Sequence, residues 1–202
     1  MKILVIGGNR FVGKKVAYEL SKLTSVSVLN RSGTGPDKVK VIKWDRNEPL
    51  TIENDYNVIL DFCLFKPTQA QHLKNWLKPN QKYIFISSAA AYKDANCLSY
   101  NEDMPIGGLS GFGEYGVEKA DCENIVKQID TNYMIIRPPY IVGHDCPRPR
   151  ISYYIRNIIN NRPVEVAGDG NKLLSFIWVN DIVNTLVDMS TTNKYNVKDS
   201  YN

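Results

Sequence analysis

A tyrosine and a lysine four positions apart, Tyr115 and Lys119, are the residues whose types and spacing most directly suggest chemistry. On a helix, residues i and i+4 lie on the same face. A lysine ammonium near a phenol favours the phenolate and lowers a pKa that is ~10 in isolation. Such a tyrosine can donate or accept a proton near neutral pH, and the same lysine can hold the ribose of a cofactor.

The spacing alone is not specific, because the chain contains a second such pair, Tyr18 and Lys22. We expect that pair to lie on the surface, because it falls well past the end of its helix that would face a phosphate. Tyr115 instead follows a glycine-rich loop and a buried strand that ends in Ser87 and Ser88. Hydroxyls at the carboxyl end of a parallel strand face the cofactor crevice, although strand-end capping is their plainer role.

The N-terminus combines a strand, a glycine-rich turn and a helix. Residues 3–6 are aliphatic, residues 7–13 read Gly-Gly-Asn-Arg-Phe-Val-Gly, and an amphipathic stretch follows. This order suits a dinucleotide pyrophosphate, which the free N–H groups and positive dipole end of the helix would hold. One position departs from the usual pattern, because Arg10 replaces the middle glycine. The alternative is a plain turn whose glycines serve geometry alone.

Strand-like and helical segments alternate along the chain, which predicts a parallel sheet with right-handed crossovers. After Pro138 the pattern changes, and a last helix to Met189 is predicted to start with Asn180 or Asp181 as its cap. The predicted strands are Ser25–Leu29, Val39–Ile42, Asn57–Phe62, Tyr83–Ser87, Tyr133–Arg137, Pro163–Val166 and Leu174–Val179. The other predicted helices are Phe11–Leu23, Thr68–Leu77, Tyr115–Gln128 and Ser152–Asn160; on the third, Val117, Ala120, Ile125 and Val126 approximate one face.

Composition limits the function classes. The 202 residues are 43% hydrophobic and 23% charged with a net charge of +4, which suits anionic ligands without demanding nucleic acid. No apolar run approaches the ~20 residues that span a bilayer, and the N-terminus has no signal-peptide pattern, so we expect a cytoplasmic protein. The four cysteines are far apart and are expected to be free thiols, and two isolated histidines predict no metal site.

Several segments in sequence order carry a family resemblance. They are the glycine-rich first turn, Ser-Ser-Ala-Ala-Ala-Tyr at 87–92, the pair Tyr115 and Lys119, and Arg-Pro-Pro-Tyr at 137–140. In these the chain resembles the extended short-chain dehydrogenase/reductase family, the nucleotide-sugar epimerases and dehydratases. Its first turn is most similar to an atypical branch that includes the chloroplast stem-loop-binding proteins.

The resemblance implies an α/β fold, a Rossmann-type doubly wound parallel sheet with helices on both faces. Residues 1–145 would form the NAD(P)-binding domain. Residues 146–202 would form a partial substrate-lobe segment that returns to the sheet. Extended members are usually considerably longer, so the resemblance implies a small or incomplete substrate lobe.

Carried over by position, the resemblance also assigns roles. Ser88 would hydrogen-bond the reacting carbonyl or alcohol, Tyr115 would be the acid/base, and Lys119 its electrostatic partner. The segment after Arg137 would border the nicotinamide. The implied cofactor-binding residues are Gly7, Asn9, Arg10, Phe11, Gly13, Arg31, Asp45, Phe62, Pro138 and Tyr140.

The choice of cofactor depends on the end of the second strand. An acidic residue there would bind the ribose 2′-hydroxyl of NAD, but this chain has Asn30 and Arg31. Arg31 together with Arg10 favours a 2′-phosphate, and so NADP over NAD; the alternative is two solvated arginines. Asp45 is at the position that contacts adenine in the family, or it is a turn aspartate.

Three functions compete. The first is an NAD(P)-dependent epimerase, dehydratase or reductase acting on a sugar or nucleotide sugar. The second is a non-catalytic, redox-sensing dinucleotide-binding module. The third and least favoured is RNA binding, because no RNA-binding motif or aromatic–basic stripe is evident. A homodimer through the helices at 68–77 and 115–128 is compatible with the apolar residues there, and no membrane or nucleic-acid partner is expected.

Overall fold

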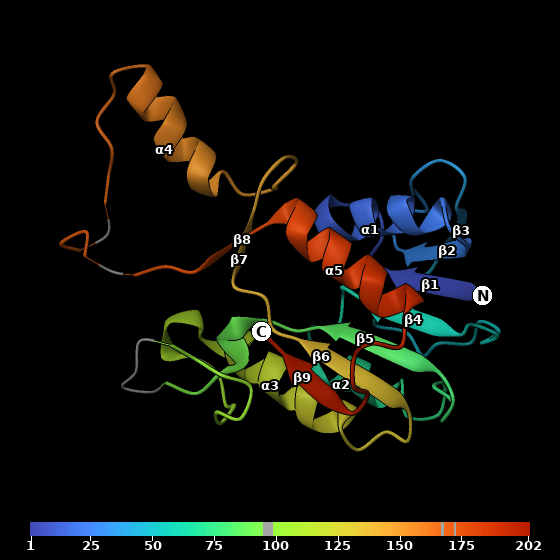
Figure 1. Cartoon of the computed structure of the whole chain (residues 1–202). Helices are drawn as coiled ribbons and strands as arrows, with labels where there is room; N and C mark the ends of the chain where they lie inside the picture. Colours follow the sequence, from blue (N-terminus) through green and yellow to red (C-terminus); the bar gives the residue numbers. More distant parts are fainter. Residues whose placement is uncertain (95–98, 167, 172) are drawn as a thin grey trace.

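The computed structural model describes residues 1–94, 99–166, 168–171 and 173–202. Its main element is a seven-stranded, all-parallel sheet in the order β3-β2-β1-β4-β5-β6-β9 (Figure 1). The strands are β1 (Lys2–Ile6), β2 (Ser25–Asn30), β3 (Lys40–Lys43), β4 (Val58–Asp61), β5 (Lys82–Ile86), β6 (Asn132–Ile136) and β9 (Asp199–Tyr201). The Rossmann-type doubly wound sheet expected from the sequence is confirmed.

Helices cover both faces of this sheet. On one face α1 (Phe11–Ser21) and α5 (Val179–Thr191) bury an aliphatic core against β1, β2 and β6. On the other face α2 (Pro67–Gln71) and α3 (Glu114–Val126) pack against β4 and β5. The central strands β1, β4 and β5 are therefore buried on both sides, which is why they read as nearly continuous apolar runs.

A second, two-stranded sheet packs against the core beneath α1 and α5 through Ile141 and Ile177. Strands β7 (Tyr140–Val142) and β8 (Phe176–Trp178) pair in parallel, and α4 (Arg150–Ile159) projects from the rest of the molecule (Figure 1). Helix α4 contains no buried residue, and Ile158 and Ile159 are 64% and 73% exposed. None of the helices among the described residues has the length and apolar character needed to cross a bilayer.

Three predicted elements are wrong in detail. Residues 163–166 form no strand. Helix α2 ends at Gln71, and the chain continues in tighter turns in which the N–H of Trp76 donates to the carbonyl of Leu73. Helix α5 begins directly from β8 with Trp178 at its N-cap, so neither Asn180 nor Asp181 caps it; Asp181 instead lies in the first turn, where a carboxylate complements the helix dipole.

On α3 the predicted apolar face is also partly wrong. Val117 is 46% exposed, whereas Lys119 and Glu123 are buried. These charged side chains take the inward positions because they have partners inside the protein, described below.

Candidate functional site

The glycine-rich turn between β1 and α1 is tightly constrained. Gly7 has φ of +88°, and a Cβ built on it would lie 2.4 Å from Cys63 Sγ. A Cβ on Gly13 would lie 2.6 Å from the carbonyl oxygen of Gly7. Only glycine allows this approach of helix to turn, and the result is a backbone cradle at the N-terminus of α1.

Arg10 and Phe11 form the start of α1. Arg10 is extended, occupies the N-cap and makes no side-chain cap bond, and its side chain is exposed. Phe11 takes the left-handed φ of +41°, which is uncommon for a residue other than glycine. Asn9 donates from Nδ2 to Ser32 Oγ at 2.9 Å, which ties the turn to the loop after β2.

Asn30, where an acidic residue would bind a ribose, is used by its own loop. Its Oδ1 accepts from Ser32 Oγ at 2.8 Å and from the N–H of Gly33 at 2.9 Å. Its Nδ2 donates to the carbonyl of Thr34 at 2.7 Å. The neighbouring Arg31 is exposed, and among the described residues its guanidinium has no hydrogen-bond or ion-pair partner. It is therefore free to bind an anion.

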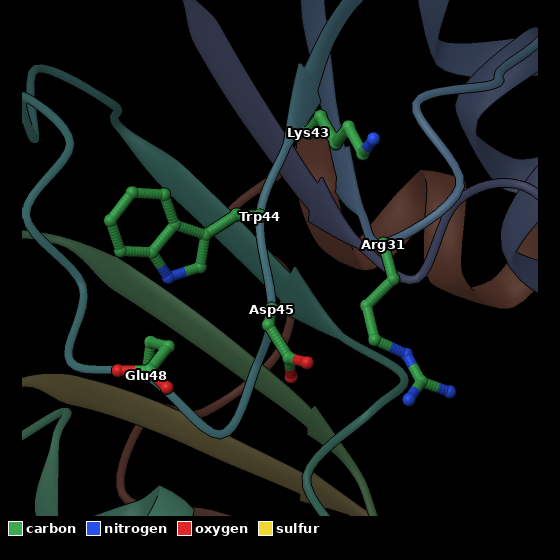
Figure 2. Close-up of a pocket in the computed structure, with 5 residues that line it drawn as sticks. All are labelled: Arg31, Lys43, Trp44, Asp45 and Glu48. Carbon is green, nitrogen blue, oxygen red and sulfur yellow. The ribbon is translucent and has the colours of Figure 1, made fainter.

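A surface pocket of about 420 Å³ lies beside this loop (Figure 2). Its lining residues are Arg31, Lys43, Trp44, Asp45 and Glu48. The carboxylate of Asp45 accepts the N–H of Asn47 at 2.9 Å, as in a turn, and still lines the pocket. Both interpretations of Asp45 from the sequence, as a turn residue and as part of a ligand site, therefore remain compatible with its position.

Phe62 and Cys63, directly after β4, border the glycine-rich turn. The N–H of Phe62 donates to the carbonyl of Ile6 at 3.0 Å, and Phe62 Cβ would be 3.2 Å from a Cβ on Gly7. Burial raises the pKa of the Cys63 thiol to about 11, so this sulfur stays protonated and apolar at neutral pH.

The two serines after β5 have different partners. Ser87 donates to Glu123 Oε1 at 2.6 Å inside the protein. Ser88 is half-buried and caps the 3₁₀ turn Ala89–Ala91, with its Oγ accepting the N–H of Ala90 at 3.2 Å. That turn packs against α3, since a Cβ on Gly116 would lie 2.5 Å from the carbonyl oxygen of Ala90. Ser88 is therefore held next to the first turn of α3.

Tyr115 and Lys119 occupy that helix in contrasting environments. Tyr115, in the first turn, is 39% exposed and makes no hydrogen bond to Lys119 or Ser88 within the described part of the chain. Lys119 is 1% exposed, and its Nζ donates to the carbonyls of Leu64 at 2.8 Å and Ile86 at 3.0 Å. Burial lowers the pKa of Lys119 to about 8, opposed chiefly by the negative charge of Asp61.

A buried ion pair, which the sequence analysis missed, supports this corner. Arg137 Nη2 lies 2.9 Å from Glu123 Oε2, and both side chains are almost fully buried. Arg137 Nη1 also donates to Tyr92 Oη at 3.0 Å. Because Glu123 binds Ser87 as well, the pair links the ends of β5 and β6 to α3. Arg137 stands out in the sequence as a charge directly after the apolar strand β6, but nothing distinguishes Glu123 from the other charged residues of α3.

Pro138 and Tyr140 continue from that corner. The carbonyl of Pro138 accepts the N–H of Ala89 at 3.0 Å, which fixes the turn after Ser88. Tyr140 lies between the rings of Phe112 and Phe176, at centroid distances of 6.2 and 6.0 Å. The guanidinium of Arg150 lies over the Tyr140 ring at 4.2 Å. An aromatic row with a cation therefore extends from η2 (Ser110–Phe112) to β8.

The candidate residues thus fall into two groups along the carboxyl edge of the sheet, where β1 and β4 are neighbours and β4 and β5 are neighbours. Gly7, Asn9, Arg10, Phe11, Gly13, Arg31, Asp45 and Phe62 surround the first turn and the pocket. Ser88, Tyr115, Lys119, Pro138 and Tyr140 surround the first turn of α3 and the segment after β6. Carboxyl edges of open parallel sheets are where ligands bind.

Comparisons with known proteins agree with this arrangement. A model of the "NAD dependent epimerase/dehydratase family" matches residues 52–202. The chain is 21% identical over 210 residues to the chloroplast stem-loop binding protein of 41 kDa b of Arabidopsis thaliana, covering 93% of this chain and 54% of that protein. It is 31% identical over 110 residues to a putative UDP-glucose 4-epimerase of Methanocaldococcus jannaschii, covering 50% of this chain and 35% of that protein. The chain thus spans about half, or less, of the length of these relatives.

Solved structures share the fold. UDP-glucuronic acid 4-epimerase from Bacillus cereus, in complex with UDP-glucuronic acid and NAD, superposes with a TM-score of 0.75 at 20% identity, covering 100% of this chain and 76% of that one. dTDP-glucose 4,6-dehydratase from Bacillus anthracis, in complex with NAD, gives a TM-score of 0.80 at 19% identity, covering 100% of this chain and 74% of that one.

Proposed function

Because the chain belongs to the NAD dependent epimerase/dehydratase family, we propose that it binds a nicotinamide dinucleotide and acts as an oxidoreductase on a sugar or nucleotide sugar, as an epimerase, dehydratase or reductase. The observation that carries the proposal is the meeting of Ser88, the first turn of α3 and the buried Lys119 at one end of the sheet. A fold kept only for packing would not need an ammonium group with its charge buried at that place.

The residues present fit the cofactor. The backbone between Gly7 and Gly13 leaves a cradle that a Cβ would fill, which suits the close approach of a pyrophosphate. The pocket at Trp44 and Asp45 suits the adenosine, and Lys119 has one more N–H than its two carbonyl partners use, which suits a ribose hydroxyl. When bound, the nicotinamide would supply a hydride acceptor and donor.

The remaining steps belong to this chain's own residues. Ser88 would hydrogen-bond the reacting oxygen of the substrate and orient it. Tyr115 would take the proton from that oxygen, or return it, at its phenol oxygen. The ammonium of Lys119 would stabilise negative charge on that phenol as the proton leaves. Pro138 would hold the turn after Ser88 in place, since its carbonyl binds Ala89.

For the cofactor, NADP is proposed in preference to NAD. The support is Arg31, whose guanidinium lines the pocket and has no partner among the described residues, beside an Asn30 whose side chain is already hydrogen-bonded. Arg10, exposed at the N-cap of α1, would add a second positive charge. Arginine is well suited to a phosphate because its donors form a fork that matches the oxygens.

The division of the chain is part of the same proposal. Residues 1–145 would bind the cofactor, and residues 146–202 would contribute part of the substrate side before returning to the sheet at β9. The exposed α4 supports the assignment of this second part to contacts outside the sheet.

The first experiment is a calorimetric titration of the chain with NADP and with NAD, followed by a turnover screen with nucleotide sugars. Binding with turnover supports the proposal. Binding without turnover favours the alternative of a non-catalytic dinucleotide-binding module, which the exposure of α4 and of β8 also favours. Failure to bind either dinucleotide would overturn the proposal.

A further inference from the structure

Asp61 is a buried carboxylate that none of the motifs above includes. It is the last residue of β4, 0% exposed, and lies opposite Ile6 in the register of the sheet. Its Oδ2 accepts from Arg46 Nη2 at 2.8 Å and from Tyr83 Oη at 2.9 Å, and its Oδ1 accepts the N–H of Cys63 at 2.9 Å. Three donors from three parts of the chain therefore converge on one carboxylate.

Arg46 connects this carboxylate to the pocket. It directly follows Asp45, which lines the pocket, and it is itself buried. Its Nη1 donates to the carbonyl of Gln69 at 3.3 Å, while its Nε is buried without a hydrogen-bond partner among the described residues. Arg46 is thus held by Asp61 more than by any other group.

The loop that follows Asp61 reaches Lys119. The carbonyl of Leu64 accepts from Nζ of Lys119, and the rings of Phe65 and Phe85 each lie 4.8 Å from that nitrogen. Because the N–H of Cys63 is bound to Asp61, the carboxylate fixes the path of the chain just before Leu64. The position of a carbonyl that holds the lysine therefore depends on Asp61.

The charge of Lys119 depends on few neighbours. Titratable groups face it from β4 (Asp61), from the loop after β4 (Cys63) and from α3 (Cys122 and Glu123). Burial raises the pKa of Cys63 to about 11 and of Cys122 to about 12, so both are neutral at pH 7. Asp61 and Glu123 are each paired with an arginine, but Asp61 favours the charged form of Lys119 most strongly and Glu123 least strongly among these groups. Asp61 is therefore the main anion that opposes the loss of the lysine proton.

We propose that Asp61 is a positioning residue that holds the Lys119 ammonium in place and keeps it charged, and that Arg46 limits how much of the Asp61 charge the lysine experiences. Its catalytic consequence rests on the proposed function, but the protonation of Lys119 is a property of the chain itself. Because Arg46 directly follows Asp45, the Arg46–Asp61 ion pair would also connect the turn at Asp45 to Lys119 through one carboxylate.

The test is a titration of the Lys119 Cε signals by NMR in protein labelled with ¹³C-lysine, with the signal assigned by its loss in Lys119→Arg. Asp61→Asn should lower the Lys119 pKa by about one unit, because the negative charge that most favours the ammonium is removed. Arg46→Gln should raise it, because Asp61 then has no competing cation. Lys22, exposed at the C-cap of α1, serves as the reference in the same spectra. Tyr83→Phe, which keeps the charges of Asp61 and Arg46, should leave the Lys119 pKa near its wild-type value.

Shifts of the Lys119 pKa in opposite directions in Asp61→Asn and Arg46→Gln support the proposal, because a general loosening of the fold would shift this pKa in the same direction in both variants. Shifts in the same direction, or no shift in Asp61→Asn, would overturn it. If Asp61→Asn does not fold, Arg46→Gln decides, and a lowered or unchanged Lys119 pKa would overturn the proposal. A pH–rate profile of the folded variants adds a catalytic readout, in which the alkaline limb should move with the Lys119 pKa. The Lys119 pKa could shift in opposite directions while neither wild type nor any variant turns over a nucleotide sugar. That result would overturn the proposed enzymatic function and leave the role of Asp61 standing.

Discussion

Two pairs of a tyrosine and a lysine with the same spacing lie at the C-terminal end of α1 and at the N-terminal half of α3, and their environments differ. On α1, Lys22 lies over the Tyr18 ring at 4.3 Å and pairs with Glu19 in solvent. On α3, Lys119 is buried against the carbonyls of Leu64 and Ile86, and Tyr115 is partly exposed in the first turn. Helix α1 contributes its backbone at the N-terminus, and α3 contributes side chains. The role proposed for the motif on α3 therefore depends on its position in the fold and not on its spacing alone.

The largest difference between the two pairs is expected when each phenol oxygen is removed in turn. Tyr115→Phe should reduce turnover about 10³-fold, within the range of general acid–base catalysis, while dinucleotide affinity stays within about twofold. Steady-state kinetics and calorimetry measure the two effects. Tyr18→Phe is the matched control and should change neither. Equal activity in the two variants would show that the acid/base assignment is wrong.

The two lysines should also differ in how they link stability to pH. The folded-state pKa of Lys119 is about 8 against 10.5 for the free side chain, so between these values only the unfolded chain keeps the proton. Across that window wild type should therefore gain about 3 kcal/mol of unfolding free energy relative to Lys119→Met. Urea unfolding at pH 7, 8, 9 and 10 checks this. The corresponding difference for Lys22→Met should stay nearly flat, and a flat Lys119→Met difference would mean that the lysine is not buried as a cation.

On α1 the sensitive feature is the backbone. In Gly13→Ala the new Cβ would meet the Gly7 carbonyl at 2.6 Å, so we expect a loss of about 1–3 kcal/mol in stability and weakened dinucleotide binding. Thermal unfolding and calorimetry report the two. Gly111→Ala, where a Cβ would meet nothing within 4 Å, is the control and should be neutral. An unaffected Gly13→Ala protein would mean that helix α1 does not need its close approach to the turn.

The smallest expected effect concerns the cofactor phosphate. Arg31→Ala should weaken NADP about tenfold, or about 1.4 kcal/mol, and NAD by less than about twofold, because only NADP offers the 2′-phosphate. Paired titrations with both dinucleotides measure this, with Arg162→Ala as an exposed arginine control. Equal losses for NADP and NAD would remove the argument for phosphate selection.

Local patterns predicted the parts of the fold that depend on local sequence. Strand β1, the glycine turn and α1 follow from four aliphatic residues, three glycines and an amphipathic stretch, and α1 begins at Phe11 as expected. Strand β9 was not assigned, because Asp-Ser-Tyr has no apolar pattern and is a strand only by pairing with β6. The strand predicted at 163–166 did not form, because nothing in the described chain pairs with it.

The sequence named a set of candidate site residues but not their arrangement. Motif order selected Ser88, Tyr115 and Lys119, whose catalytic roles stay predictions. The charged partners Glu123 and Arg137 and the pair of Arg46 with Asp61 escaped notice, because the members of each pair lie 14 or 15 positions apart. Only the packing of α3 and of the loop after β3 onto the sheet shows that these charges are buried and paired.

The two outermost strands have a consequence for handling the protein in solution. Strand β3 begins and ends with lysine, and β9 contains an aspartate and a serine. Charged and polar side chains on edge strands discourage pairing with the sheet of another molecule. Strand β9 covers the apolar strand β6, so a partly unfolded chain in which β9 has detached would expose the run Met134–Ile136 as an open edge. Aggregation during refolding or heating should therefore begin at β6, and strengthening the attachment of β9 is the direct way to suppress it.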